Sequence, residues 1–344
     1  MPRSFRLAII GVMVRIGISE DIPADLLRDF PENVQIVRLP DTFQQNVEVE
    51  VWIPPTFGWQ SASIFQHLQG VKFVQCLLAG VDWITPWLPK EILLCDGQGI
   101  HNTPVAEWVV AAVLGSLKRF PEYRDRQREQ AWAGQVRRGG ANAKQEADRP
   151  GNEENQRSEA RVPYRILGDE LAQKKVLIVG YGGIGEEVER LIHPFDVEVL
   201  RVARTARAGV SAMGELEMLL PKADVVVLLV PLTPATRGLM NTKMLARMKP
   251  GALLVNAARG PVVDTDALLA ALNTGRLHAV LDVMDPEPLP PGQPLWLAPN
   301  CFITPHVAGS VAQYAARAYK FAAEQIRRYV AGEPLKNRVN SAGY

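Results

Sequence analysis

Three side chains in the C-terminal half each follow closely on a short apolar run, and together they could reduce a carbonyl group. The residues are Arg259, Glu287 and His306. Because the carboxyl ends of parallel strands line one crevice, we expect these side chains to converge there. A histidine can donate a proton to a developing alkoxide, a carboxylate can hold its ring, and an arginine can bind a carboxylate. Taken singly, each residue also has an ordinary structural explanation: Arg259 as an exposed arginine, Glu287 as a loop glutamate and His306 as a core histidine.

A glycine-rich segment supplies the site for a second reactant. The sequence Gly-Tyr-Gly-Gly-Ile-Gly follows the apolar run Lys175–Val179 and precedes a helical pattern to Ile192. In this G-x-G-x-x-G motif the first glycine permits a tight turn, the second lets backbone approach a pyrophosphate, and the third allows close packing of helix on strand. The motif predicts that a dinucleotide binds at Gly180, Gly182, Gly183, Ile184 and Gly185.

The residues after the next strand indicate which dinucleotide binds. An acidic residue about 20 positions after the glycines commonly bonds the ribose hydroxyls of NAD. This chain has Arg204 and Thr205 at that point, with Arg207 close by. Arginine attracts a 2′-phosphate, so the sequence favours NADP(H). NAD(H) stays possible if these are ordinary loop arginines.

The elements that must position these residues form two series of short apolar runs. A length of 344 residues suggests about two domains. Runs that are apolar throughout are typical of strands buried on both faces of a parallel sheet. We therefore predict an α/β protein with two doubly wound lobes. The predicted strands are Leu7–Ile10, Gln35–Leu39, Val49–Ile53, Phe73–Cys76 and Ile92–Cys95, then Lys175–Val179, Val197–Val202, Val225–Val230, Ala252–Asn256, His278–Leu281 and Cys301–Thr304.

Two segments do not fit this pattern of short apolar strands. Val105–Leu117 predicts a helix that is apolar all round, with Thr103 as its cap and Pro104 at its first position. Such a helix must be buried on all sides, between lobes or between subunits, and we favour a dimer interface. The stretch from about 139 to 161 is polar and lacks periodicity, which predicts a solvated insertion whose role the sequence does not indicate.

Composition excludes several other classes of protein. Lys plus Arg (38) balances Asp plus Glu (37), so no nucleic-acid partner is expected. Cys76, Cys95 and Cys301 are far apart, which favours neither disulfides nor a metal site and fits the cytoplasm. The N-terminal run Leu7–Val14 fits a strand better than a signal peptide, and no run approaches the ~20 apolar residues of a membrane helix.

Most of the chain closely resembles the D-2-hydroxyacid dehydrogenase family. The insertion and a less distinctive first ~70 residues lie outside the resemblance. The motifs that carry it, besides the glycine loop, are L-A-G-V-D at 78–82, H-N-T-P-V-A-E at 101–107, V-P-L-T at 230–233, N-A-A-R-G at 256–260, L-D-V-M-D-P-E-P at 281–288 and T-P-H-V-A-G at 304–309.

The resemblance implies a role for each of these segments. Arg259, Glu287 and His306 are the catalytic residues it implies, and Asp282 would bind the nicotinamide carboxamide. The backbone of Ala79, Gly80 and Val81 would cradle the substrate carboxylate together with Arg259 and His306. Pro231 and Ala257 would flank the cofactor.

The resemblance also implies an architecture and an activity. Residues 1–101 and 308–344 would form a flavodoxin-like substrate domain, and 102–307 an inserted Rossmann domain. The apolar helix would be a homodimer helix. The implied reaction reduces a small 2-oxo acid to a D-2-hydroxy acid, and Arg204 resembles the NADP-using glyoxylate and hydroxypyruvate reductases in particular.

Other functions on this fold stay open. Nucleotide-sensing corepressors keep similar residues, although the near-neutral charge counts against that reading. Phosphite-oxidising relatives keep the same catalytic trio. Formate dehydrogenase relatives pair the histidine with glutamine, and Glu287 argues against that function.

Overall fold

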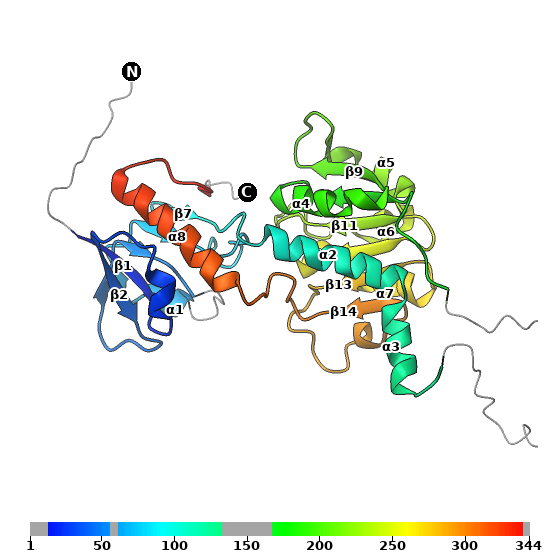
Figure 1. Cartoon of the computed structure of the whole chain (residues 1–344), viewed down its shortest axis with the longest axis horizontal. Helices are drawn as coiled ribbons and strands as arrows, with labels where there is room; N and C mark the ends of the chain where they lie inside the picture. The colour runs from blue at the N-terminus through cyan, green and yellow to red at the C-terminus, as the bar shows by residue number, and fades with distance from the viewer. Residues whose placement is uncertain (1–12, 56–60, 133–166, 340–344) are drawn as a thin grey trace, which may run out of the picture.

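Two lobes, each built on its own parallel sheet, make up the protein (Figure 1). The computed structural model describes residues 13–55, 61–132 and 167–339. The chain crosses between the lobes just before helix α2 (Asn102–Leu117) and again after strand β14 (Cys301–Ile303). The predicted α/β class with two parallel sheets is confirmed.

The first lobe has five parallel strands in the order β2-β1-β4-β6-β7. This is the flavodoxin-like order 2-1-3-4-5. Helix α8 (Tyr314–Ala331) returns to this lobe, and its buried alanines and Ile326 pack on the apolar strands. The strands are β1 (Val14–Ser19), β2 (Val34–Leu39), β4 (Val51–Trp52), β6 (Phe73–Gln75) and β7 (Leu93–Cys95); the pair β3 (Val47–Glu48) and β5 (Leu68–Gln69), the 3-10 turn η1 (Ala24–Leu27) and helix α1 (Ser61–Phe65) complete the lobe.

Strand β1 is one that the sequence analysis missed. The strand expected at Leu7–Ile10 lies outside the described residues, and no strand was expected at Val14–Ser19. Arg15 lies near the start of β1, where it pairs with Glu48 at 3.3 Å, while Ile16 and Ile18 are fully buried. A charged residue near a strand end is tolerated because its side chain reaches the surface.

The second lobe has seven parallel strands in the order β10-β9-β8-β11-β12-β13-β14. The first six follow the Rossmann order 3-2-1-4-5-6. Their carboxyl ends form one edge, where the glycine loop and the predicted catalytic segments begin. The strands are β8 (Lys175–Val179), β9 (Glu198–Ala203), β10 (Ser211–Ala212), β11 (Val225–Leu228), β12 (Leu253–Asn256), β13 (His278–Leu281) and β14; the helices are α4 (Gly183–Ile192), α5 (Leu216–Leu219), α6 (Thr242–Arg247) and α7 (Thr265–Asn273), with short 3-10 turns between them.

Helix α2 begins earlier than predicted and is capped differently. His101, and not Thr103, is the N-cap residue, and Pro104 is the third helical residue. The prediction erred because helical geometry extends into the polar residues before the apolar run. Only one face of α2 is buried, against α4 and the second sheet, while Ala111 is exposed. Within one chain, therefore, the helix is not covered on all sides. Helix α3 (Phe120–Arg128) follows it.

The predicted insertion at 139–161 lies outside the described residues. In the part of the chain that the structure describes, no helix is long and apolar enough to cross a membrane.

Candidate active site

The turn after β12 sets the position of Arg259. The amide of Asn256, 1% exposed, donates to the Arg259 carbonyl at 3.2 Å and accepts from the Ala258 N–H at 3.1 Å. A Cβ on Gly260 would lie 1.9 Å from the Met284 carbonyl oxygen. Only glycine fits there, so the turn is in direct backbone contact with the loop that leads to Glu287.

Arg259 reaches across to the first lobe. Its Nη2 lies 3.3 Å from Asp82 Oδ1, and its Nη1 donates to the Ala258 carbonyl at 2.8 Å. A Cβ on Gly80 would lie 1.6 Å from Nη2, so the guanidinium packs directly against the Gly80 backbone. The structure therefore brings together the arginine and the loop that the resemblance assigned to a carboxylate. Asp82 stood within the L-A-G-V-D motif but was given no role.

His306 and Glu287 form a close pair. His306 Nδ1 lies 2.5 Å from Glu287 Oε1, which leaves Nε2 as the ring atom for a ligand. Both side chains are partly exposed, as groups that meet a substrate must be. His306 has φ +54°, a left-handed conformation that a non-glycine residue rarely adopts and that turns the chain sharply at this point.

Asp282 holds the loop that carries His306. It is 2% exposed and accepts hydrogen bonds from Thr304 Oγ1 at 2.6 Å, the Val307 N–H at 2.8 Å and the Ala308 N–H at 2.9 Å. Its own carbonyl accepts from the His306 N–H at 2.7 Å. Such a carboxylate fixes the path of residues 304–308. The sequence analysis did not foresee this role, and contact with a nicotinamide carboxamide stays a prediction.

The glycine loop has the shape of a pyrophosphate cradle. Gly180 has φ +100°, and a Cβ there would lie 2.6 Å from the Leu229 carbonyl carbon. Gly182 caps α4, and a Cβ there would meet nothing within 4 Å, so backbone faces open space at the helix N-terminus. Gly185 packs closely on Ile178. These residues fit a bound dinucleotide, whose phosphates would meet the helix N–H groups.

A network of side chains braces this loop from the side. Tyr181 donates its hydroxyl proton to Glu189 at 2.6 Å, and Arg201 forms a forked ion pair with the same carboxylate. The Arg201 guanidinium holds the pKa of Glu189 below its usual range. Arg207 donates to the Tyr181 carbonyl at 2.7 Å and lies 5.6 Å from the Tyr181 ring centre. Sequence reasoning missed this network because it depends on distant pairings.

The other predicted cofactor residues lie around the same edge. Arg204 and Thr205 are exposed in the turn after β9. Pro231 follows β11, and its carbonyl accepts from Thr236 Oγ1 at 2.6 Å. Ala257 follows β12. All four thus follow the carboxyl ends of strands beside the glycine loop, where a Rossmann fold binds its ligand.

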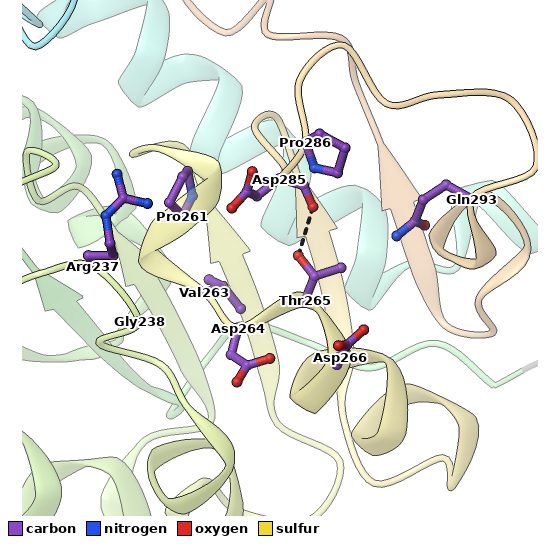
Figure 2. Close-up of a pocket in the computed structure, with 10 residues that line it drawn as sticks. All are labelled: Arg237, Gly238, Pro261, Val263, Asp264, Thr265, Asp266, Asp285, Pro286 and Gln293. Carbon is purple, nitrogen blue, oxygen red and sulfur yellow. Dashed lines mark hydrogen bonds between the residues drawn. The ribbon is translucent and has the colours of Figure 1, made fainter.

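A hollow of about 500 Å³ lies beside this edge (Figure 2), and it is not the candidate site. None of the catalytic trio lines it. Three aspartates face it with Arg237, and Thr265 donates to the Asp285 carbonyl at 3.0 Å. Its predominantly acidic lining is unsuited to an anionic 2-oxo acid.

The fold and the geometry of the trio define a class of protein, the nicotinamide-nucleotide oxidoreductases. Comparison with known proteins identifies the family within this class. The family model for the NAD-binding domain of D-isomer specific 2-hydroxyacid dehydrogenases matches residues 110–308. A curated glyoxylate reductase of Thermofilum pendens is 32% identical over 288 residues, which is 81% of this chain and 78% of that protein.

Solved structures show the same likeness. A D-isomer specific 2-hydroxyacid dehydrogenase from Xanthobacter autotrophicus, in complex with NADPH and MES, is 29% identical with a TM-score of 0.73, covering 95% of this chain and 98% of that one. An NADPH-dependent glyoxylate/hydroxypyruvate reductase from Sinorhizobium meliloti, in complex with NADP and sulfate, is 25% identical with a TM-score of 0.75, covering 96% and 100%. The chain belongs to the D-isomer specific 2-hydroxyacid dehydrogenase family of NAD(P)-dependent oxidoreductases.

Proposed function

We propose that this enzyme reduces a small 2-oxo acid to the D-2-hydroxy acid with NADPH. The observation that carries the proposal is the His306–Glu287 pair, 2.5 Å apart, on the same sheet edge as the guanidinium that rests on Gly80. A proton donor and a carboxylate site beside a glycine loop are the groups that such a reduction needs.

Each residue acts on a different atom of the substrate. Arg259 and the backbone of the Ala79–Gly80–Val81 loop bind the carboxylate, which orients the neighbouring carbonyl. The reduced nicotinamide, when bound, supplies the hydride. His306 Nε2 donates its proton to the oxygen of that carbonyl as negative charge develops there. Glu287, on Nδ1, keeps the ring in place.

The choice of NADPH rests on the turn after β9. Arg204 and Thr205 stand where an NAD-binding chain would carry a carboxylate, and Arg207 is fixed close by. These groups favour a 2′-phosphate. The relatives from Xanthobacter autotrophicus and Sinorhizobium meliloti were solved with NADPH and NADP, which supports the same choice.

We extend the proposal to the organisation of the enzyme. Residues 1–101 and 308–344 act as the substrate domain and 102–307 as the nucleotide domain. The uncovered face of α2 packs on a second copy in a homodimer. The enzyme works in the cytoplasm, where its three thiols stay reduced.

A panel of glyoxylate, hydroxypyruvate, pyruvate and bulkier 2-oxo acids, each with NADPH and with NADH, tests the proposed function. The oxidation of the nicotinamide is followed by its absorbance. We expect turnover of one or more of the small acids, with NADPH the better cofactor. If no member of the panel is reduced with either cofactor, the proposed function is wrong.

A further inference from the structure

The backbone of the loop that we assign to the substrate carboxylate is held on both sides of Gly80. Before it, the Gly97 N–H donates to the Leu78 carbonyl at 2.8 Å, and a Cβ on Gly97 would lie 2.5 Å from backbone atoms of the same segment. After it, Val81 begins a turn in which its carbonyl accepts from the Thr85 N–H at 3.0 Å, and the Val81 side chain is 1% exposed. Close packing and hydrogen bonds therefore fix the chain on either side of this position.

Gly80 itself has no side chain that could restrain its peptide group. A Cβ at this position would lie 1.6 Å from Arg259 Nη2 and 3.1 Å from Asp82 Oδ1, so the contact with the guanidinium requires a glycine. Glycine is also the residue with the greatest backbone freedom. A peptide group that turns here would offer its carbonyl oxygen to the guanidinium, which carries only N–H donors. An Arg259 that donates to Gly80 would have fewer donors for a substrate carboxylate.

Trp83 holds the Gly80 carbonyl. Its indole Nε1 donates to that oxygen at 3.0 Å. The Arg259 guanidinium donates instead to the Ala258 carbonyl and to the Asp82 carboxylate. The Trp83 ring is partly buried and packs against the apolar cluster of the first lobe, so its N–H group has a stable base. The carbonyl beside the guanidinium thus has a donor of its own.

We propose that Trp83 is a positioning residue for the carboxylate-binding loop. By donating to the Gly80 carbonyl, the indole fixes the peptide plane that follows Gly80 and keeps its oxygen off Arg259. The guanidinium then stays available to the carboxylate of the 2-oxo acid. The inference rests on the proposed function and adds to it a residue that acts through the loop. Loss of the indole N–H weakens the binding of substrate and leaves proton transfer by His306 unaffected.

Two variants, Trp83→Phe and Trp83→His, separate the N–H group of Trp83 from the bulk of its side chain. Phenylalanine keeps a large apolar ring but has no donor. Histidine buries less apolar surface, yet its five-membered ring carries Nε2 where the indole carries Nε1, and a neutral histidine can donate from that atom. If only packing matters, the histidine variant is the more impaired. If the N–H group matters, the phenylalanine variant is.

Initial rates with the 2-oxo acid that the parent reduces fastest give KM for each variant. We expect Trp83→Phe to raise this KM about three- to tenfold, as for the loss of one hydrogen bond, with kcat and KM for NADPH changed less than about twofold. Trp83→His should keep KM within about twofold of the parent, although its Tm falls below that of Trp83→Phe. A KM that ranks the two variants as Tm does, or that Trp83→Phe leaves unchanged, would overturn the proposal.

Trp87→Phe is the matched control. The indole Nε1 of Trp87 donates to the Trp83 carbonyl at 2.9 Å, which is the same kind of bond in the same turn. We expect less than about a twofold change of KM, because the Gly80 carbonyl keeps its donor. An equal rise of KM in Trp87→Phe and Trp83→Phe would show that the loss of any indole bond loosens the turn, which would contradict the role of Trp83.

The same measurements distinguish a failure of this inference from a failure of the proposed function. A parent that reduces no 2-oxo acid would contradict the proposed function and the role of Trp83 with it. An active parent whose KM is unchanged in Trp83→Phe would contradict the role of Trp83 alone.

Discussion

Asp82 and Arg259 stand 177 positions apart in the sequence, yet their side chains form an ion pair of 3.3 Å between the two lobes. The pair places one carboxylate of the protein on the guanidinium that we assign to the substrate carboxylate. Both side chains are about one-third exposed, so solvent weakens the interaction. Asp82 therefore orients Arg259 and also competes with the substrate for it.

Asp82→Asn should lower KM for the 2-oxo acid by about two- to fivefold. Asparagine keeps the acceptor oxygen that orients the guanidinium but removes the competing charge, and a partly exposed ion pair contributes about 1 kcal/mol or less. Initial rates over a range of substrate concentration give KM. Glu48→Gln, which breaks the Arg15 pair in the same lobe, serves as control. A higher KM in Asp82→Asn would show that orientation outweighs competition.

His306→Asn should lower kcat by ~10²- to 10⁴-fold, the usual contribution of a general acid. Binding of NADPH, measured by fluorescence titration, should change little, because we assign the cofactor phosphates to the glycine loop and the turn after β9, and His306 to the substrate oxygen. Glu287→Gln should reduce kcat less, because the amide oxygen can still accept a hydrogen bond from His306 Nδ1. Retention of more than half of kcat in His306→Asn would refute the mechanism.

Arg204→Asp should reverse the cofactor preference. The parent is expected to favour NADPH by roughly ten- to several-hundredfold, since charge-assisted contacts to phosphate contribute ~1.5–3 kcal/mol each. An aspartate at the same position repels a 2′-phosphate and can bond the ribose hydroxyls of NADH. The measurement is kcat/KM for both cofactors at one saturating 2-oxo acid. A preference that Arg204→Asp leaves unmoved would mean that Arg204 does not contact the cofactor.

Glu189→Gln should weaken binding of adenosine 2′,5′-bisphosphate more than that of 5′-AMP, by about three- to tenfold. The carboxylate of Glu189 holds Tyr181 and Arg201, and the Tyr181 carbonyl in turn positions Arg207. Calorimetric titration of the two mononucleotides measures the effect without turnover. Glu187→Gln, which breaks the Arg190 pair on the same helix, should leave the ratio unchanged. Equal ratios in both variants would contradict the role of the brace.

Asp96→Asn should stabilise the protein at neutral pH. Asp96 is 5% exposed, and burial raises its pKa from 3.8 to about 6. The folded state therefore binds the proton more tightly than the unfolded state. The stability this gives is complete below pH 3.8 and is lost as the pH rises through about 6. Asparagine keeps an acceptor for the Gln98 N–H without the buried charge.

Thermal unfolding measures the effect of Asp96→Asn. Its Tm should exceed that of the parent at pH 7.5, by roughly 2–4 °C for each kcal/mol gained, and the difference should shrink towards pH 4.5. A constant difference across this range would show that the Asp96 charge is not responsible.

The sequence predicted the elements whose signals are local. Buried strands such as Lys175–Val179 and His278–Leu281 were predicted at their observed bounds, because both faces of a central parallel strand are apolar. The spacing of the glycines likewise predicted the cofactor loop between strand and helix. Strand β1 was missed because the strand was placed earlier, in the apolar run Leu7–Val14, and the cap of α2 was misplaced because His101 carries no local capping signal.

What the sequence did not reveal depends on contacts between distant segments. Nothing near Asp82 indicates that Arg259 will reach it, and nothing near His101 indicates that Gly309 will leave room for its ring. The motif around Asp282 was legible, but its hydrogen bonds to residues 304–308 require the adjacent strand β14 to be in place. Such roles follow from the packing of strands and not from residue spacing.

The bonds that Asp282 accepts from Val307 and Ala308 come from main-chain N–H groups, which every residue except proline possesses. The position of the neighbouring His306 therefore depends on hydrogen bonds between main-chain N–H groups and one side chain, the Asp282 carboxylate. Val307, 38% exposed, is free to vary in size and polarity without displacing the histidine. Substitutions of Val307 other than proline should therefore leave the position of His306 unchanged, whereas substitutions of Asp282 should displace it.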